Sequence, residues 1–168
     1  VSLFAILIAL PFGLAVAVYM SEVADHKIRN LMKPVIELLS GIPSVVYGFF
    51  GLIVIVPLLQ RVFDLPVGES GLAGSIVLAI MALPTIITVT EDAMRNCPRA
   101  MREASLALGA SQWQTIYKVV IPYSISGITS GVVLGIGRAV GETMAVLMVT
   151  GNAAVIPHSI LEPLRTIP

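Results

Sequence analysis

The stretch SGLAGSIVLAIMALPTIITVT, from Ser70 to Thr90, contains no charged residue and is the clearest indication of the fold. The hydrocarbon core of a membrane is about 30 Å thick, and about 20 helical residues cross it. This stretch is therefore long enough to span a membrane as one helix. Three other stretches are comparable: residues 1–21 and 38–60 carry no charge, and residues 119–161 contain only Arg138 and Glu142.

The composition supports a membrane environment. The chain has 168 residues, of which 57% are hydrophobic and 12% are charged, and its mean hydropathy is +0.95. A soluble domain is about 45–50% apolar and about 25% charged, so this chain has about half the charge needed for a soluble surface. The sequence predicts an all-α, polytopic transmembrane helical bundle with spans at about residues 1–21, 38–60, 70–94 and 123–150.

Several other classes of protein are disfavoured by the same sequence. Ten basic and ten acidic residues give a net charge of zero, which leaves no electrostatic footprint for nucleic acid. The single cysteine and the two distant histidines, Cys97, His26 and His158, have no metal-ligand spacing. We therefore expect no metal site, no catalytic residue and no resident cofactor, and we expect a protein that is not an enzyme.

Basic residues in the connections predict the orientation. Seven lie in the loops after the first and third spans, against two on the opposite side, Arg61 and Arg165. The seven are Lys27, Arg29, Lys33, Arg95, Arg99, Arg102 and Lys118. We therefore expect residues 22–37 and 91–122 to be cytoplasmic, in a multi-pass protein of a prokaryotic plasma membrane. Since the first span begins without Met and the tail is rich in proline, we also expect residues 1–168 to be a single transmembrane domain within a longer chain, with a further span following.

The cytoplasmic loop at residues 95–122 has the pattern of two helices joined by a turn. Good helix formers fill residues 99–108, Gly109 suits a left-handed helix stop, and Ser111 with Gln114 forms an S-x-x-Q capping box. A second helix should run to about Ile121, before span four. Pattern alone favours a stabilising interfacial helix.

Glu103-Ala104-Ser105, followed by Gly109, Val119 and Ile121-Pro122, resembles the EAA signature of binding-protein-dependent ABC importer permeases. Ser105 replaces the second Ala of the signature, E-A-A-x3-G-x9-I-x-L-P. The resemblance implies the MetI-like permease fold and a loop that docks on a separate ATP-binding subunit. The coupling residues that it implies are Arg102, Glu103, Ala104, Ser105 and Gly109.

Span four carries two charges and three spaced glycines. At about 100° per residue, Arg138 and Glu142 fall on the same face as the glycines, whose four-residue spacing is typical of close helix packing. These glycines are Gly127, Gly131 and Gly135. A charge at the bilayer centre costs about 2.5–3.5 kcal/mol or more. Chemistry alone leaves two interpretations open: Arg138 binds an oxyanion and Glu142 balances it when no anion is present, or the two form an ion pair that holds helices together.

The run from Gly137 to Asn152, with R-A-V-G-E-T-M-A-V at its centre, looks like that of PstC-type permeases of the phosphate ABC importer, and Gly41 to Gly48 matches their G-I-P-S-V-V-Y-G segment. The sister PstA-type subunit resembles this up to G-E-T and then differs. The resemblance implies a permease subunit whose partners are a PstA-type second permease, an ATP-binding subunit dimer that uses ATP and Mg, and an extracytoplasmic phosphate-binding protein.

Polar residues on the spans complete the predicted phosphate path. The stripe Ser40, Ser44, Tyr47 and Gly51 begins span two, and the stripe Thr85, Thr88, Asp92 and Arg95 ends span three. The path residues that we predict are Arg138, Glu142, Thr143, Ser44, Tyr47, Thr85 and Thr88. The alternatives left open are a PstA-type subunit, a permease for another oxyanion, and a membrane scaffold that transports nothing.

Overall fold

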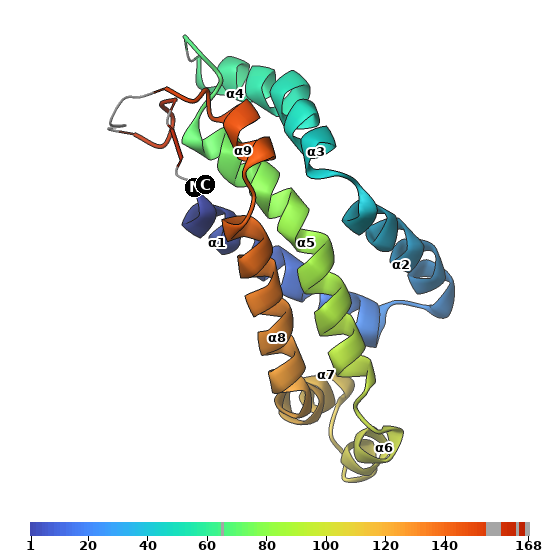
Figure 1. Cartoon of the computed structure of the whole chain (residues 1–168). Coiled ribbons are helices and arrows are strands. Elements are labelled where there is room, and N and C mark those ends of the chain that lie inside the picture. Colours follow the sequence, from blue (N-terminus) through green and yellow to red (C-terminus); the bar gives the residue numbers. More distant parts are fainter. Residues whose placement is uncertain (65, 154–158, 164, 167–168) are drawn as a thin grey trace.

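The computed structural model describes residues 1–64, 66–153, 159–163 and 165–166, and these residues form helices and no strand (Figure 1). The predicted all-α bundle is confirmed. In chain order the helices are α1 (Ser2–Val18), η1 (Tyr19–Val23), α2 (His26–Gly41), α3 (Ser44–Phe50), η2 (Gly51–Ile55), α4 (Val56–Phe63), α5 (Gly71–Arg95), α6 (Arg99–Ala107), α7 (Gln112–Thr115), η3 (Ile116–Val120), α8 (Ile121–Val140) and α9 (Met144–Val149), where η marks a π-helical turn.

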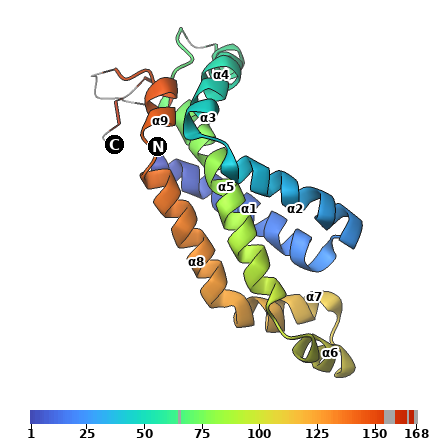
Figure 2. The same cartoon turned by 45° about the vertical axis from the view of Figure 1, so that its right-hand side comes forward.

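Four helical segments are long and apolar enough to cross a membrane: Ser2–Val23, Ser44–Phe63, Gly71–Arg95 and Gln112–Val140. The third, α5, is the central one. In its most apolar part 61% of the residues are buried within the chain, against 22–33% in the other three. Figures 1 and 2 show α1, α8 and the α2–α3 arm arranged around α5, with α6 and α7 at its lower end.

The second span begins later than the charge-free stretch suggests. Residues 38–41 end α2, a separate helix that sequence reasoning treated as a connection, and the span starts at Ser44. Pro43 is the physical reason, because a proline forces the residue before it out of the helical region. Ile42 is accordingly extended, with φ −69° and ψ 131°.

The predicted continuous helix over residues 123–150 is wrong. α8 ends at Val140 and α9 begins at Met144. Glycine is a poor helix former, and after Gly141 the carboxylate of Glu142 accepts a hydrogen bond from the backbone N–H of Ala145 at 3.2 Å. This bond gives the backbone a local alternative to the continuous helix. At its other end, α8 continues without a gap from α7 through η3, so Pro122 does not separate two helices.

The three spaced glycines of α8 lie against α5. A side-chain carbon added at Gly127 would come within 2.3 Å of Ala93 Cβ, one at Gly131 within 2.9 Å of Thr90 Oγ1, and one at Gly135 within 2.5 Å of Ile86 Cγ1. The backbones of α5 and α8 therefore approach as closely as these glycines permit. The sequence placed Arg138 and Glu142 on the same helix face as these glycines. The two residues do not share that face in the structure, because α8 ends between them.

Gly127→Ala is expected to destabilise the subunit by about 1–3 kcal/mol, since overpacking a tight contact has that cost. Gly137→Ala is the matched control on the same helix, because nothing lies within 4 Å of an added carbon there. Alanine is otherwise the better helix former by about 1 kcal/mol, so the control should be neutral or stabilising. Thermal unfolding of the two purified variants checks the prediction, and equal midpoints would contradict the packing described.

Candidate functional site

Arg138 lies where three helices meet, near the end of α8. One guanidinium nitrogen, Nη1, donates to Thr85 Oγ1 of α5 at 3.2 Å and to Ser40 Oγ of α2 at 3.5 Å, and Nη2 donates to the carbonyl oxygen of Ser40 at 3.4 Å. All three acceptors are neutral. Among the described residues no carboxylate lies within ion-pair distance of Arg138. Its charge is therefore held in place by neutral partners and is not cancelled by an acid.

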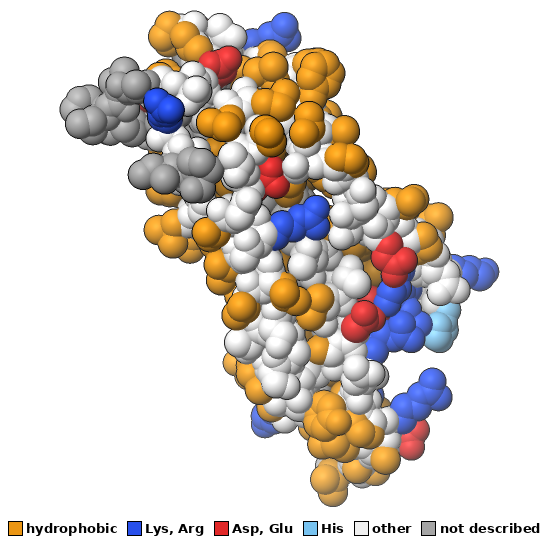
Figure 3. Space-filling view, viewed as in Figure 1, with side chains coloured by type: hydrophobic (Ala, Val, Ile, Leu, Met, Phe, Trp, Pro, Cys, Tyr) orange, Lys and Arg blue, Asp and Glu red, His pale blue; other side chains and the backbone are white. Residues whose placement is uncertain are grey.

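Glu142 occupies the break between α8 and α9. Its carboxylate accepts from the N–H of Ala145 at the start of α9, so it caps a helix and forms no ion pair with Arg138. The expected balance between the two charges is therefore absent from this conformation. Figure 3 shows one basic and one acidic patch in the middle of this face, surrounded by apolar and uncharged side chains.

The break in the α8–α9 arm lies beside the break in the α2–α3 arm. A side-chain carbon added at Gly48 of α3 would lie 2.8 Å from the Cα of Ala145 in α9, so these two short helices pack backbone to backbone. Tyr47, which is buried, donates from its hydroxyl to the carbonyl oxygen of Leu39 in α2 at 2.6 Å. This hydrogen bond ties α3 to α2 across Pro43 and fixes the position of Ser40 relative to Arg138.

The other predicted path residues are less closely connected. Thr85 contacts Arg138 directly, whereas Ser44, Thr88 and Thr143 are partly buried and their side chains form no hydrogen bond within the described part of the chain. The structure thus brings Arg138, Thr85 and Ser40 together, with Tyr47 and Glu142 on the adjoining helix ends. The roles of all seven predicted residues in transport remain predictions.

The loop at the lower end has the predicted helix–turn–helix geometry. Gly109 has φ +84°, and the N–H groups of Gly109 and Ala110 donate to the carbonyl oxygens of Leu106 and Ser105. This pairing is the Schellman arrangement, which ends a helix with a left-handed residue. The predicted capping box is also confirmed, with both hydrogen bonds between Ser111 and Gln114 present.

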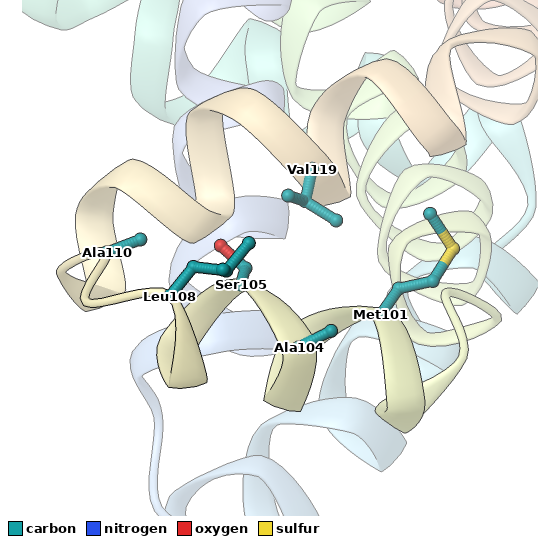
Figure 4. A pocket seen from close by; sticks show the side chains of 6 residues that line it. All are labelled: Met101, Ala104, Ser105, Leu108, Ala110 and Val119. Atoms are coloured by element: carbon teal, nitrogen blue, oxygen red, sulfur yellow. The ribbon is translucent and has the colours of Figure 1, made fainter.

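An open hollow of about 390 Å³ with an apolar lining lies between α6 and η3 (Figure 4). Side chains of α6 face Val119 of η3 across it, and Ala104 and Ser105 of the predicted coupling set lie in its wall. Ser105 Oγ also lies 3.0 Å from Thr115 Oγ1, which joins the helices. Leu108 in its wall is 89% exposed, and Trp113 of α7 and Tyr117 of η3 are 68% and 74% exposed. Such large apolar side chains at a polar end mark an interaction surface.

Arg102 and Glu103, both predicted to couple to an ATPase, point to different environments. Arg102 forms an ion pair with Glu22 at the end of the first span and donates to the carbonyl oxygen of Met94 at 2.8 Å. Glu22 is 6% exposed, and removing one partner of a buried pair costs about 3–5 kcal/mol. Arg102 therefore fixes α6 to the bundle. Glu103 is exposed and forms no ion pair among the described residues.

Sequence reasoning missed the ionic cluster that joins α2 to α5. Lys33 binds Asp92 at 2.7 Å and the buried Glu91 at 3.2 Å. The hydrogen bond with Asp92 is the main cause of a raised Lys33 pKa, so the pair stabilises the fold below the ordinary lysine pKa and weakens as pH rises through the raised value. The i,i+4 spacing of Glu91 and Arg95 was the only signal available in the sequence.

Four apolar helices long enough to cross a membrane, with Arg138 held between three of the helices, are the features of a multi-pass membrane protein. Residues 9–164 match the family described as binding-protein-dependent transport system inner membrane component, and the chain belongs to this family. It is a multi-pass membrane protein by the same family description and by its four apolar spans.

Individual relatives of this chain are permease proteins. The chain is 50% identical over 159 residues to the Probable ABC transporter permease protein YqgH of Bacillus subtilis, and the aligned region covers 95% of this chain and 52% of that protein. It is 38% and 37% identical to the Phosphate transport system permease proteins PstC of Mesorhizobium japonicum and Pasteurella multocida, over 99% of this chain. The chain spans about half the length of the curated relatives it matches, 52–58% of these three.

Proposed function

We propose that this chain forms the core of a permease subunit in an ATP-driven phosphate importer. The observation that carries the proposal is Arg138, a guanidinium at the junction of α2, α5 and α8 whose partners are all neutral. A planar guanidinium with five donors suits the oxygens of phosphate, and no described carboxylate competes for it. The similarity to PstC proteins over 99% of the chain supports phosphate as the anion.

Each proposed partner would bind a different surface of the bundle. The apolar hollow between α6 and η3, with exposed Leu108 and Trp113 beside it, is the surface that would receive an ATP-binding subunit. ATP and Mg then belong to that subunit, and this chain is not an enzyme. A PstA-type second permease would complete the path, since three of the four spans expose most of their surface. An extracytoplasmic phosphate-binding protein would deliver the anion.

Transport would proceed by alternating access. ATP binding in the partner would move α6 and α7, and the continuous helix from α7 to α8 would carry this movement to Arg138. The breaks at Pro43 and Gly141 are where the upper parts of the two arms would turn relative to the lower parts, and at Pro43 this movement would require the Tyr47–Leu39 hydrogen bond to open. Phosphate would be released when Arg138 turns back to its neutral partners.

The proposed function can be tested with the full-length subunit, reconstituted with its partners in proteoliposomes. We expect uptake of radiolabelled phosphate that requires ATP and the loaded binding protein and that excess sulfate does not reduce. Competition by sulfate would indicate that the permease transports an oxyanion other than phosphate. Absence of an ATPase from the purified complex would favour the scaffold alternative.

A further inference from the structure

We propose that a second site, distant from Arg138 in the fold, binds a phosphate group where α2, α5 and α6 meet. A pocket of about 210 Å³ lies there, with four arginines and a histidine in its wall. These residues, which we name the arginine pocket, are Arg29, Arg95, Arg99, Arg102 and His26. Liquid water occupies about 30 Å³ per molecule, so the pocket has room for a phosphate group with a few waters.

The positive charge of the arginine pocket is only partly neutralised. Arg102 is paired with Glu22, and Arg95 lies 3.6 Å from Glu91, whose other carboxylate oxygen binds Lys33. Neither Arg99 nor Arg29 has an ion pair among the described residues, and the Arg29 guanidinium lies 3.2 Å from the Nδ1 atom of His26. Among the described residues, no acidic side chain lines the pocket itself, and the two carboxylates nearby are those of Glu22 and Glu91. Two guanidinium groups are therefore available for an anion.

The N-terminus of α6 adds to this excess. Arg99 is its first residue and Arg102 its fourth, no acidic residue lies in the first turn, and Pro98 supplies no side-chain cap. A helix N-terminus carries a partial positive charge, so basic side chains there are unfavourable unless an anion is bound. A phosphate group in the pocket would accept charge-assisted hydrogen bonds from the arginines and from the free amides of this turn.

The location defines two sources for the phosphate group. The pocket adjoins the ends of two spans, Val23 and Arg95, on the side where basic loops predict the cytoplasm. Figure 3 shows basic side chains and a histidine gathered on the right-hand side of this face, with acidic side chains beside them. Basic clusters directly beside a membrane-spanning helix recognise anionic lipid headgroups. Inorganic phosphate in the cytoplasm would reach the same pocket.

The test uses the complete permease–ATPase complex in neutral detergent and measures its thermal midpoint, because a ligand that binds only the folded state raises that midpoint. One series adds inorganic phosphate against chloride at equal ionic strength, and the other adds phosphatidylglycerol against phosphatidylcholine. We expect a rise in the complex that carries Arg138→Gln, in which the proposed transport-path site is removed, and loss of that rise when Arg29→Gln and Arg99→Gln are added. Arg95 and Arg102 are kept because they hold ion pairs.

The matched control is Lys27→Gln, Arg61→Gln, which removes the same charge outside the pocket and should retain the rise. Loss of the phosphate-dependent rise in the pocket variant assigns free phosphate, and loss of the phosphatidylglycerol-dependent rise assigns a lipid headgroup. All these variants are compared in the Arg138→Gln background, so that phosphate bound at the proposed transport-path arginine does not contribute to the rise. No rise in this background, or a rise that survives when the pocket substitutions are added to it, overturns the proposal. If the double variant does not fold, Arg99→Gln alone serves, and Arg99→Lys should restore the rise.

Discussion

Arg138→Gln is expected to abolish phosphate uptake while the subunit still assembles with its partners. Glutamine retains an amide that can bond Thr85 and Ser40, the neutral partners of Arg138, but it has no charge for an oxyanion. Hydrogen bonds to charged groups contribute about 1.5–3 kcal/mol each. Loss of two such bonds to phosphate lowers uptake by a factor of about one hundred or more. Uptake into proteoliposomes and co-purification of the ATPase measure the two effects.

Thr85→Val separates this role from a purely structural one. It removes the 3.2 Å hydrogen bond to Arg138 but leaves the charge in place. If Arg138 binds the anion, Thr85→Val should reduce uptake much less than Arg138→Gln does. If Arg138 only joins α8 to α5, the two variants should weaken assembly to a similar degree, and Arg138→Gln with normal uptake would end the anion proposal.

The apolar spans could be predicted from sequence because the requirement is one of length and hydropathy. Residues 70–94 and the helix Gly71–Arg95 differ by a single residue at each end. The helix breaks at Pro43 and after Val140 could not be predicted in the same way. Pro43 is a potential helix breaker, yet prolines also lie inside α1, α2 and α5 without ending these helices. Whether a proline ends a helix depends on neighbours that satisfy the backbone, and a single sequence does not contain that information.

The sequence identified individual residues of the site, but not most of the contacts between them. Arg138 was identifiable because a charge within an apolar span is costly, and Gly109 because its turn requires a left-handed residue. The Arg138–Glu142 pairing failed because it assumed a regular helix through Gly141. The Glu22–Arg102 pair joins residues 80 positions apart, and no local pattern connects them. Arg102 was therefore assigned to a docking surface when its side chain fixes α6 to the bundle.

Gly109→Pro is expected to uncouple ATP hydrolysis from transport. Proline fixes φ near −65°, whereas Gly109 has φ +84°, so the turn between α6 and α7 cannot keep its shape. The substitution also removes the N–H that bonds Leu106 and disfavours the helical conformation of Leu108. Strain and lost hydrogen bonding together amount to about 3 kcal/mol or more, which is enough to displace α6 and open the apolar hollow.

Uncoupling should appear as a loss of transport-linked ATP hydrolysis while the membrane spans remain folded. The ATPase either fails to co-purify or hydrolyses ATP at a rate that the loaded binding protein no longer changes. Gly109→Asn is the control, because asparagine tolerates a left-handed backbone and nothing lies within 4 Å of an added carbon at this position. Since the site has open space, any defect in the proline variant that asparagine does not share comes from backbone geometry and not from bulk. Normal association and turnover in Gly109→Pro would remove the turn from the coupling mechanism and leave the exposed side chains of Leu108 and Trp113 as the docking contacts.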